Sequence, residues 1–160
     1  MIGFAPMSAG TKNAQIQGIR NYFPERIIDN KHFEETLDTT DAWILERTGI
    51  KERRRSEPHE TPSFMGAEAV KSLLTALNEK AEDIDIIICA TITGDYSFPA
   101  TAGIIQHRVG AKKAWAFDIS AACSGFIFAL DTARSFIQSG MAKKVIVVAA
   151  EKMSAIINPT

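Results

Sequence analysis

The feature that most constrains the fold is a nearly continuous apolar run at residues 84–92, Ile-Asp-Ile-Ile-Ile-Cys-Ala-Thr-Ile. A strand with one wet face alternates apolar and polar residues, whereas a strand covered on both faces is apolar almost throughout. The run therefore predicts a buried strand in a parallel or mixed sheet that lies between two layers of helices. Residues 114–120 and 144–150 are predicted to be further strands.

Helical patterns separate these strands. Thr61-Pro62 is expected to open a long helix, with proline at its first position and an apolar stripe that runs to Leu77. A second helix is expected to open at Phe98-Pro99 and to stop at Gly110, and a third spans 124–139. The regular alternation of strand and helix predicts an α/β layered fold.

The segment before residue 60 has shorter elements. Residues 1–14 are predicted to be a flexible leader, and residues 15–22 mix apolar and polar side chains in the manner of a first strand. Asn30 is expected to cap one short helix, because asparagine is a common residue at that position. Thr40 is expected to cap a second short helix, which ends at Gly49.

The net charge, the length of the apolar runs and the cysteine pattern limit the classes of protein to which this chain can belong. The formal net charge is −1, so no overall field favours nucleic acid or an anionic membrane as partner. The start of the chain does not have the pattern of a signal peptide, and no apolar run is long enough to span a bilayer. Neither the cysteines nor the histidines have the spacing of a metal site. The two cysteines, Cys89 and Cys123, do not form a disulfide pattern, which favours a reducing, cytoplasmic location.

Cys123 is the candidate nucleophile. It stands in the segment Asp-Ile-Ser-Ala-Ala-Cys-Ser-Gly-Phe at 118–126, between a predicted strand and a predicted helix. The free N–H groups and dipole of a helix start favour a thiolate and an oxyanion on a bound thioester. Buried cysteines are common, so this local pattern alone leaves a simple core residue as an equal alternative. Cys89 lies inside the apolar run and is expected to be buried and inert.

Several separate motifs agree with one family. In chain order they are Thr39 to Ile50 followed by Glu52-Arg53-Arg54, Phe98 to Ala102 with Gln106-His107, Asp118 to Phe126, Lys143-Lys144-Val145, and Ala150-Glu151-Lys152. Together they resemble the N-terminal half of the β-ketoacyl-acyl-carrier-protein synthase III family of the thiolase superfamily. The resemblance implies the thiolase-like fold, with residues 15–160 as the first half of an αβαβα architecture that has a mixed sheet with helices on both faces.

The resemblance also implies an activity. An acyltransferase of this family starts fatty acid synthesis by decarboxylative condensation of a short acyl-CoA, such as acetyl-CoA, with malonyl-acyl-carrier protein. The acyl group is held as a thioester on the cysteine that matches Cys123, and no cofactor is needed because acyl-CoA is a substrate. The resemblance further implies a homodimer, and a catalytic histidine and asparagine in a C-terminal half that is absent from this chain.

Four more residues take roles from the resemblance. Trp43 and Arg47 are expected to sandwich the adenine ring of CoA at the entrance to the site, and Thr39 to contact the nucleotide. Phe98 is expected to cross the dimer interface into the acyl pocket of the partner. The basic run Arg53-Arg54-Arg55 fits CoA phosphates, an acidic carrier protein or a solvated loop, and its role stays open.

Two other functions stay open. The first is another thiolase-superfamily enzyme that condenses acyl-CoA, such as a hydroxymethylglutaryl-CoA synthase-like enzyme. The second is a non-catalytic half-domain that binds acyl groups without condensing them, although the presence of Cys123 speaks against it.

Overall fold

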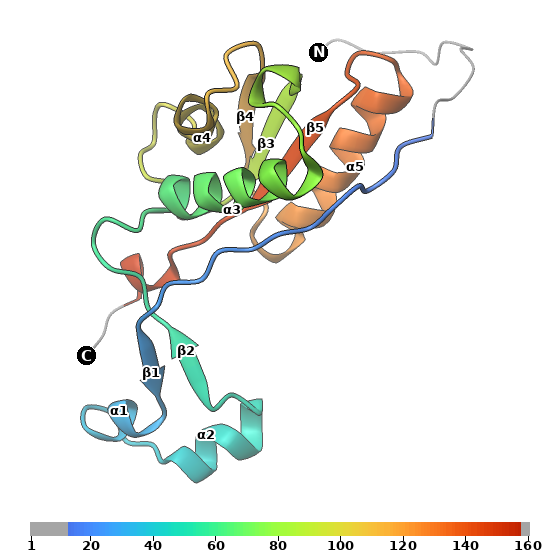
Figure 1. Cartoon of the computed structure of the whole chain (residues 1–160). Helices are drawn as coiled ribbons and strands as arrows, with labels where there is room; N and C mark the ends of the chain where they lie inside the picture. Colours follow the sequence, from blue (N-terminus) through green and yellow to red (C-terminus); the bar gives the residue numbers. More distant parts are fainter. Residues whose placement is uncertain (1–12, 158–160) are drawn as a thin grey trace.

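The computed structural model of the chain describes residues 13–157, so the predicted leader at 1–14 lies almost wholly outside the described residues. The body is a three-stranded sheet in the order β4-β3-β5 with helices on both faces (Figure 1). The strands and helices of the body are β3 (Ile86–Ala90), β4 (Trp115–Ile119), β5 (Val145–Ala149), α3 (Pro62–Leu77), α4 (Thr101–Val109) and α5 (Gly125–Gln138). Three short 3-10 turns complete the chain: η1 (Ala81–Asp83), η2 (Ala122–Ser124) and η3 (Met153–Ala155).

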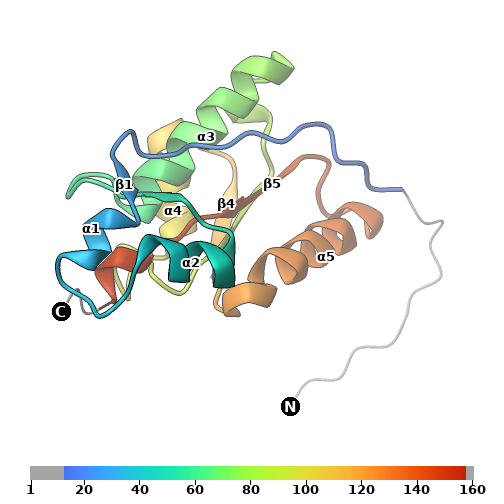
Figure 2. The same ribbon diagram turned by 90° about the horizontal axis from the view of Figure 1, so that it is seen from below.

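The central strand β3 confirms the first prediction. All five of its residues are buried, and it pairs in parallel with β4 on one side and β5 on the other. Alternate side chains of β3 point to opposite faces, so Ile87 and Cys89 join the core beneath α3 and α4, whereas Ile86 and Ile88 pack against α5. Figure 2 shows α5 on the opposite side of the sheet from α3 and α4. The α/β fold with helices on both faces is therefore confirmed.

The sheet of the body is parallel over its three strands. The mixed sheet implied by the resemblance is not seen in residues 13–157, because the antiparallel strands form a separate two-stranded sheet. That sheet joins β1 (Ile27–Asp29) to β2 (Glu52–Arg54), and the chain between them forms α1 (Lys31–Glu34) and α2 (Asp41–Thr48). Residues 26–55 form a small unit below the body in Figure 1, which we call the N-terminal lobe.

The predicted strand at 15–22 is wrong for this structure. The segment is extended but belongs to neither sheet, and its apolar side chains Ile16 and Ile19 are 64% and 74% exposed. It runs along α3 instead, where a Cβ on Gly18 would lie 3.0 Å from Cδ1 of Leu73. A strand needs a partner for its N–H and C=O groups, and none of the described strands provides one here.

The predicted helix starts are confirmed where the side chain of the expected capping residue accepts a hydrogen bond from the first turn. Thr40 accepts a hydrogen bond from the N–H of Trp43, and Thr61 accepts one from Phe64. Asn30 precedes α1 as expected, but its side chain makes no capping bond, and Asp29 accepts the N–H of His32 instead. The helix expected to open at Phe98-Pro99 begins two residues later, at Thr101.

Candidate active site

Cys123 lies on an exposed turn between the sheet and α5. It is the central residue of η2, which follows the carboxyl end of β4 and leads directly into the first residue of α5. The carboxyl ends of parallel strands share one edge of a sheet, which is where ligands bind in many α/β proteins. The structure therefore presents the predicted nucleophile to solvent at that edge, and the alternative of a buried core cysteine is not seen.

The backbone just before Cys123 has an uncommon conformation. Ala122 has φ 45°, in the left-handed region that residues with a Cβ rarely adopt. Such residues cost on the order of 1–3 kcal/mol and persist where the surroundings hold them, often at functional sites. The turn that carries the exposed Cys123 thus begins with a backbone conformation that the surrounding structure must hold.

The backbone N–H groups of this turn are largely used within it. The N–H of Ser124 bonds to the carbonyl of Ala121 at 3.0 Å, and the N–H of Gly125 bonds to the carbonyl of Ala122. The prediction that free N–H groups at the helix start face the substrate needs correction, because these two are engaged by the 3-10 turn.

Small residues near Cys123 serve close packing. A Cβ on Gly125 would lie 3.2 Å from the Cβ of Ala90 at the end of β3, tighter than most real contacts. The glycine therefore lets the first turn of α5 approach the central strand, and this approach fixes the position of the turn that carries Cys123.

Two carboxylates, for which the sequence predicted no role, make hydrogen bonds that fix the segments at this edge of the sheet. Asp118 on β4 accepts the N–H groups of Thr101 and Ala102, both at 2.7 Å, and so fixes the start of α4. Glu151 follows β5 and accepts the N–H of Ile92 at 2.9 Å, together with two threonine hydroxyls of the loop after β3. Both residues stood in the motifs of the resemblance, but their partners lie on other elements of the fold.

Cys89, unlike the exposed Cys123, is buried. It is fully buried on β3 beneath α3 and α4. Burial raises the pKa of the Cys89 thiol far above its usual range, and the nearby carboxylate of Asp118 acts in the same direction. A neutral, inaccessible thiol is inert, as the sequence predicted.

The residues predicted to bind CoA gather in the N-terminal lobe. A hollow of about 310 Å³ contains Thr39 and Trp43 together with other side chains of α1, α2 and β2. The indole of Trp43 is 52% exposed, and the hydroxyl of Thr39 is buried without a hydrogen-bond partner. The hollow is lined by Phe33, Leu37, Asp38, Thr39, Trp43, Ile44 and Arg53.

The guanidinium of Arg47 lies over the indole of Trp43, and Arg47 is not among the residues that line the hollow. Its guanidinium carbon is 4.8 Å from the centroid of the indole ring, the distance of a cation–π contact. The two predicted partners of the adenine ring are thus stacked on each other, and a ring could enter between them only if Arg47 swung away. The open face of the hollow instead offers the Trp43 indole together with Thr39.

Phe98 is 88% exposed and precedes the start of α4. Ordinary packing beside Pro99 is excluded by that exposure, and a role toward a partner subunit stays a prediction.

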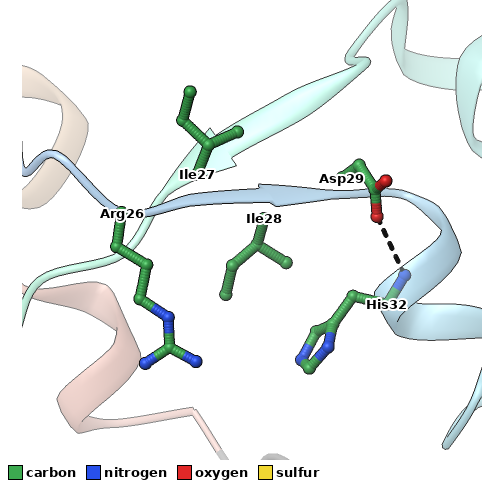
Figure 3. A pocket seen from close by; sticks show the side chains of 5 residues that line it. All are labelled: Arg26, Ile27, Ile28, Asp29 and His32. Carbon is green, nitrogen blue, oxygen red and sulfur yellow. Dashed lines mark hydrogen bonds between the residues drawn. The ribbon is translucent and has the colours of Figure 1, made fainter.

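A second hollow, of about 290 Å³, is lined by residues of β1 and by the neighbouring Arg26 and His32. Figure 3 shows its lining: the side chains of Arg26 and His32 lie on the same side of β1 as Ile28, and Asp29 bonds to the backbone of His32. It includes none of the predicted site residues.

Neither a metal-binding cluster nor a helix able to span a membrane is found among the described residues. Within residues 13–157 there is no group of three or more histidine, cysteine or acidic side chains placed to hold a metal ion. Over the same range, every helix is too short or too polar to cross a membrane.

Comparison with known proteins addresses the family resemblance. The family model described as 3-oxoacyl-[acyl-carrier-protein] synthase III matches residues 117–160, the stretch that contains Cys123. The chain is 48% identical to a β-ketoacyl-[acyl-carrier-protein] synthase III of Chlorobium phaeovibrioides over 92% of its own length and 45% of that protein. The resemblance to the synthase III family is confirmed.

Solved structures give the same result. The chain superposes on the 3-oxoacyl-[acyl-carrier-protein] synthase III of Aquifex aeolicus with a TM-score of 0.86 and 48% identity, covering 89% of this chain and 46% of that one. The priming β-ketosynthase of the R1128 polyketide pathway gives a TM-score of 0.91 at 35% identity, covering 96% of this chain and 46% of that one. These neighbours confirm the thiolase-like fold class. The chain spans a little less than half the length of the relatives it matches, and it corresponds to their N-terminal portion.

Proposed function

We propose that this chain supplies the acyl-accepting cysteine and the CoA entrance of a β-ketoacyl-acyl-carrier-protein synthase III. The single observation that carries the proposal is Cys123, exposed on a constrained turn at the carboxyl edge of a parallel sheet, inside the segment that matches the family. Its thiolate would attack the carbonyl carbon of a short acyl-CoA such as acetyl-CoA. The bond to the CoA sulfur then breaks, CoA leaves as a thiol after taking a proton, and the acyl group remains on Cys123.

The second step would need residues beyond those of this chain. Condensation joins the acyl group to the carbanion formed when malonyl-acyl-carrier protein loses carbon dioxide. The resemblance assigns the donors that stabilise this carbanion to a histidine and an asparagine of the C-terminal half. The three histidines here, His32, His59 and His107, match none of these, so the chain alone is expected to stop at the acylated cysteine.

The hollow of the N-terminal lobe fits the nucleotide end of CoA. The Trp43 indole offers a flat exposed face, and the buried Thr39 hydroxyl lacks a partner that a base or ribose would supply. Arg47 would leave its stack on Trp43 to cover the inserted ring. Phe98 would reach a second subunit of a homodimer. The protein would act in the cytoplasm and need no cofactor besides its CoA and carrier-protein substrates.

Acylation by labelled acetyl-CoA tests the first step. The chain is incubated with the label, and the modified peptide is located by mass spectrometry. We expect label on Cys123 in the parent and in the matched control Cys89→Ser, and none in Cys123→Ser. Label that survives Cys123→Ser would refute the proposal, and a parent that takes no label although it binds CoA would favour an acyl-binding half-domain.

A chimera tests the second step. Fusion of this chain to the C-terminal half of the Chlorobium phaeovibrioides relative would supply the missing donors. We expect β-ketoacyl product from the chimera with malonyl-acyl-carrier protein and none from the chain alone. Product from the chain alone would contradict the assignment of these donors to the other half.

A further inference from the structure

The N-terminal lobe holds its shape with very little apolar core. Within residues 26–55 only two hydrophobic side chains, Ile28 and Ile44, are buried, each 7% exposed. The larger apolar side chains of α2 face solvent, among them Trp43 and Leu45. Burial of two isoleucines is small compared with the entropy lost in ordering thirty residues, so other contacts must fix this lobe.

Asn30 is the most buried polar residue of the lobe, at 1% exposed. Its Nδ2 group donates to Oδ1 of Asp41 at 2.7 Å and to the carbonyl of Ile50 at 2.8 Å. Its Oδ1 accepts from Nη1 of Arg53 at 2.6 Å. The chemistry fixes the orientation of this amide, because arginine can only donate and the other two partners can only accept.

These three bonds reach the two ends of α2 and the strand beside it. Asp41 is the first residue of α2, Ile50 follows the Gly49 that ends it, and Arg53 lies on β2. Arg53 also lines the Trp43 hollow, with its guanidinium carbon 4.8 Å from the ring centroid of Phe33. One buried amide therefore joins the helix that carries Trp43 to Arg53, another residue that lines the hollow.

We propose that Asn30 is a positioning residue for nucleotide binding: it clamps both ends of α2 and the Arg53 wall, and so keeps the Trp43 hollow in its binding shape. The inference rests on the proposed function, because it takes CoA as the ligand of that hollow. Asn30 does not line the hollow and acts only through its three partners. No other side chain of the lobe bonds to both ends of α2.

Loss of these three bonds should lower the fraction of molecules in which α2 keeps its place. Asn30→Asp replaces the two donors by an acceptor and sets a carboxylate against Asp41 and the Ile50 carbonyl, so both contacts become repulsive. If α2 then keeps its place for only a tenth of the time, the apparent dissociation constant for CoA rises about tenfold. The double variant Asn30→Asp with Asp41→Asn returns a donor to the pair and keeps the partner of Arg53, so it should recover part of the affinity.

Fluorescence of Trp43 reports both binding and position. The chain has two tryptophans, and Trp115→Phe removes the other, which lies on β4 in the body. In that background, quenching by acetyl-CoA gives the dissociation constant, and anisotropy of the indole reports the mobility of α2. Asn21→Asp, at an exposed asparagine outside the lobe, is the matched control.

The outcomes separate the two proposals. We expect Asn30→Asp to weaken binding about tenfold or more and to lower Trp43 anisotropy, with partial recovery in the double variant and no change in Asn21→Asp. Cys89, which is buried in the body, should stay unmodified by iodoacetamide in all of them, which shows that the body remains folded. Binding by Asn30→Asp within twofold of the parent, or unchanged anisotropy, would overturn the positioning role. Absence of quenching in the parent would overturn the proposed CoA site, while the anisotropy would still decide the role of Asn30 in holding α2.

Discussion

The carboxylate of Asp118 offers the sharpest test of how the edge that carries Cys123 is held together. Its two oxygens accept the N–H groups of Thr101 and Ala102, each at 2.7 Å. These are the first N–H groups of α4, which have no partner within the helix. Asp118 thus joins the start of α4 to the strand that leads into the cysteine turn, and Asp118→Asn should weaken both connections.

The expected loss follows from the bonds. An amide keeps one acceptor oxygen and turns an NH₂ group toward the second N–H, so one hydrogen bond to a charged group is lost, at about 1.5–3 kcal/mol. The negative charge also leaves a helix N-terminus, where it is worth about 0.3–1 kcal/mol. Asp118→Asn should therefore lower the free energy of unfolding by about 2–4 kcal/mol, a large share of the stability of an ordinary domain.

Urea unfolding followed by far-ultraviolet circular dichroism measures this loss. The control is Asp131→Asn on α5, whose carboxylate is 63% exposed and pairs with Arg134 one turn away. Such surface pairs contribute about 0–1 kcal/mol, so the control should stay close to the parent. A loss in Asp118→Asn no larger than in Asp131→Asn would refute the reasoning that Asp118 anchors α4.

Three further predictions address the thiols, the turn and acid stability. Iodoacetamide at neutral pH should alkylate the exposed Cys123 and leave Cys89 unmodified until the chain unfolds, and equal labelling of the two thiols by peptide mass spectrometry would contradict the burial of Cys89. Ala122→Gly should raise the urea-derived stability by about 0.5–1 kcal/mol, because glycine accepts φ 45° without strain; a loss would show that the turn is not strained. The N–H groups of Lys143 and Lys144 lower the pKa of Asp85, so its contribution is complete above the unfolded pKa of about 3.9 and is lost as pH falls through the lower folded value. Asp85→Asn should accordingly make unfolding less dependent on pH below about 5 in acid titrations, and an unchanged pH dependence would contradict this linkage.

The parts of the fold that the sequence predicts well depend on neighbours in the chain. The run at 84–92 is apolar because β3 is covered on both faces, and any strand in that position would show it. Thr40 and Thr61 cap helices by accepting N–H groups three residues away, so each capping residue and its partner lie in the same short stretch of sequence. Cys123 belongs to this class only in part: the strand, turn and helix place it at a sheet edge, but this pattern left a core residue as an equal alternative, and its exposure is known only from the fold.

The parts that the sequence could not predict depend on distant partners. Residues 15–22 have the pattern of a strand, but a strand forms only where an edge is free to pair with it, and that is a property of the whole sheet. Asn30 stands where a cap is expected, yet its amide bonds to Asp41, Ile50 and Arg53, which are 11 to 23 residues away. Asp118 likewise meets α4 only because β3 and β4 lie side by side.

The two parts of the proposed site are joined through one short segment. Glu151 holds the loop after β3, and the next residue, Lys152, donates from Nζ to the carbonyl of Glu57 at 2.7 Å. Glu57 lies just past the end of the N-terminal lobe, where its N–H bonds to the buried carboxylate of Glu60 at 2.6 Å.

The hydroxyl of Tyr22 donates to the same carboxylate, which raises the pKa of Tyr22 to about 12 and lowers that of Glu60. These charged and polar bonds tie the segments on either side of the lobe to each other and to the end of β5. Acyl transfer requires that the thiol and the nucleotide site stay at the separation set by the CoA molecule, since misplacement by about 1 Å can cost two orders of magnitude in rate. Glu151 and Lys152 therefore help to set the distance between Cys123 and the Trp43 hollow, because one bonds to the loop after β3 and the other to Glu57. This accounts physically for two polar residues at the end of a buried strand, which neither touch the hollow nor act as nucleophile.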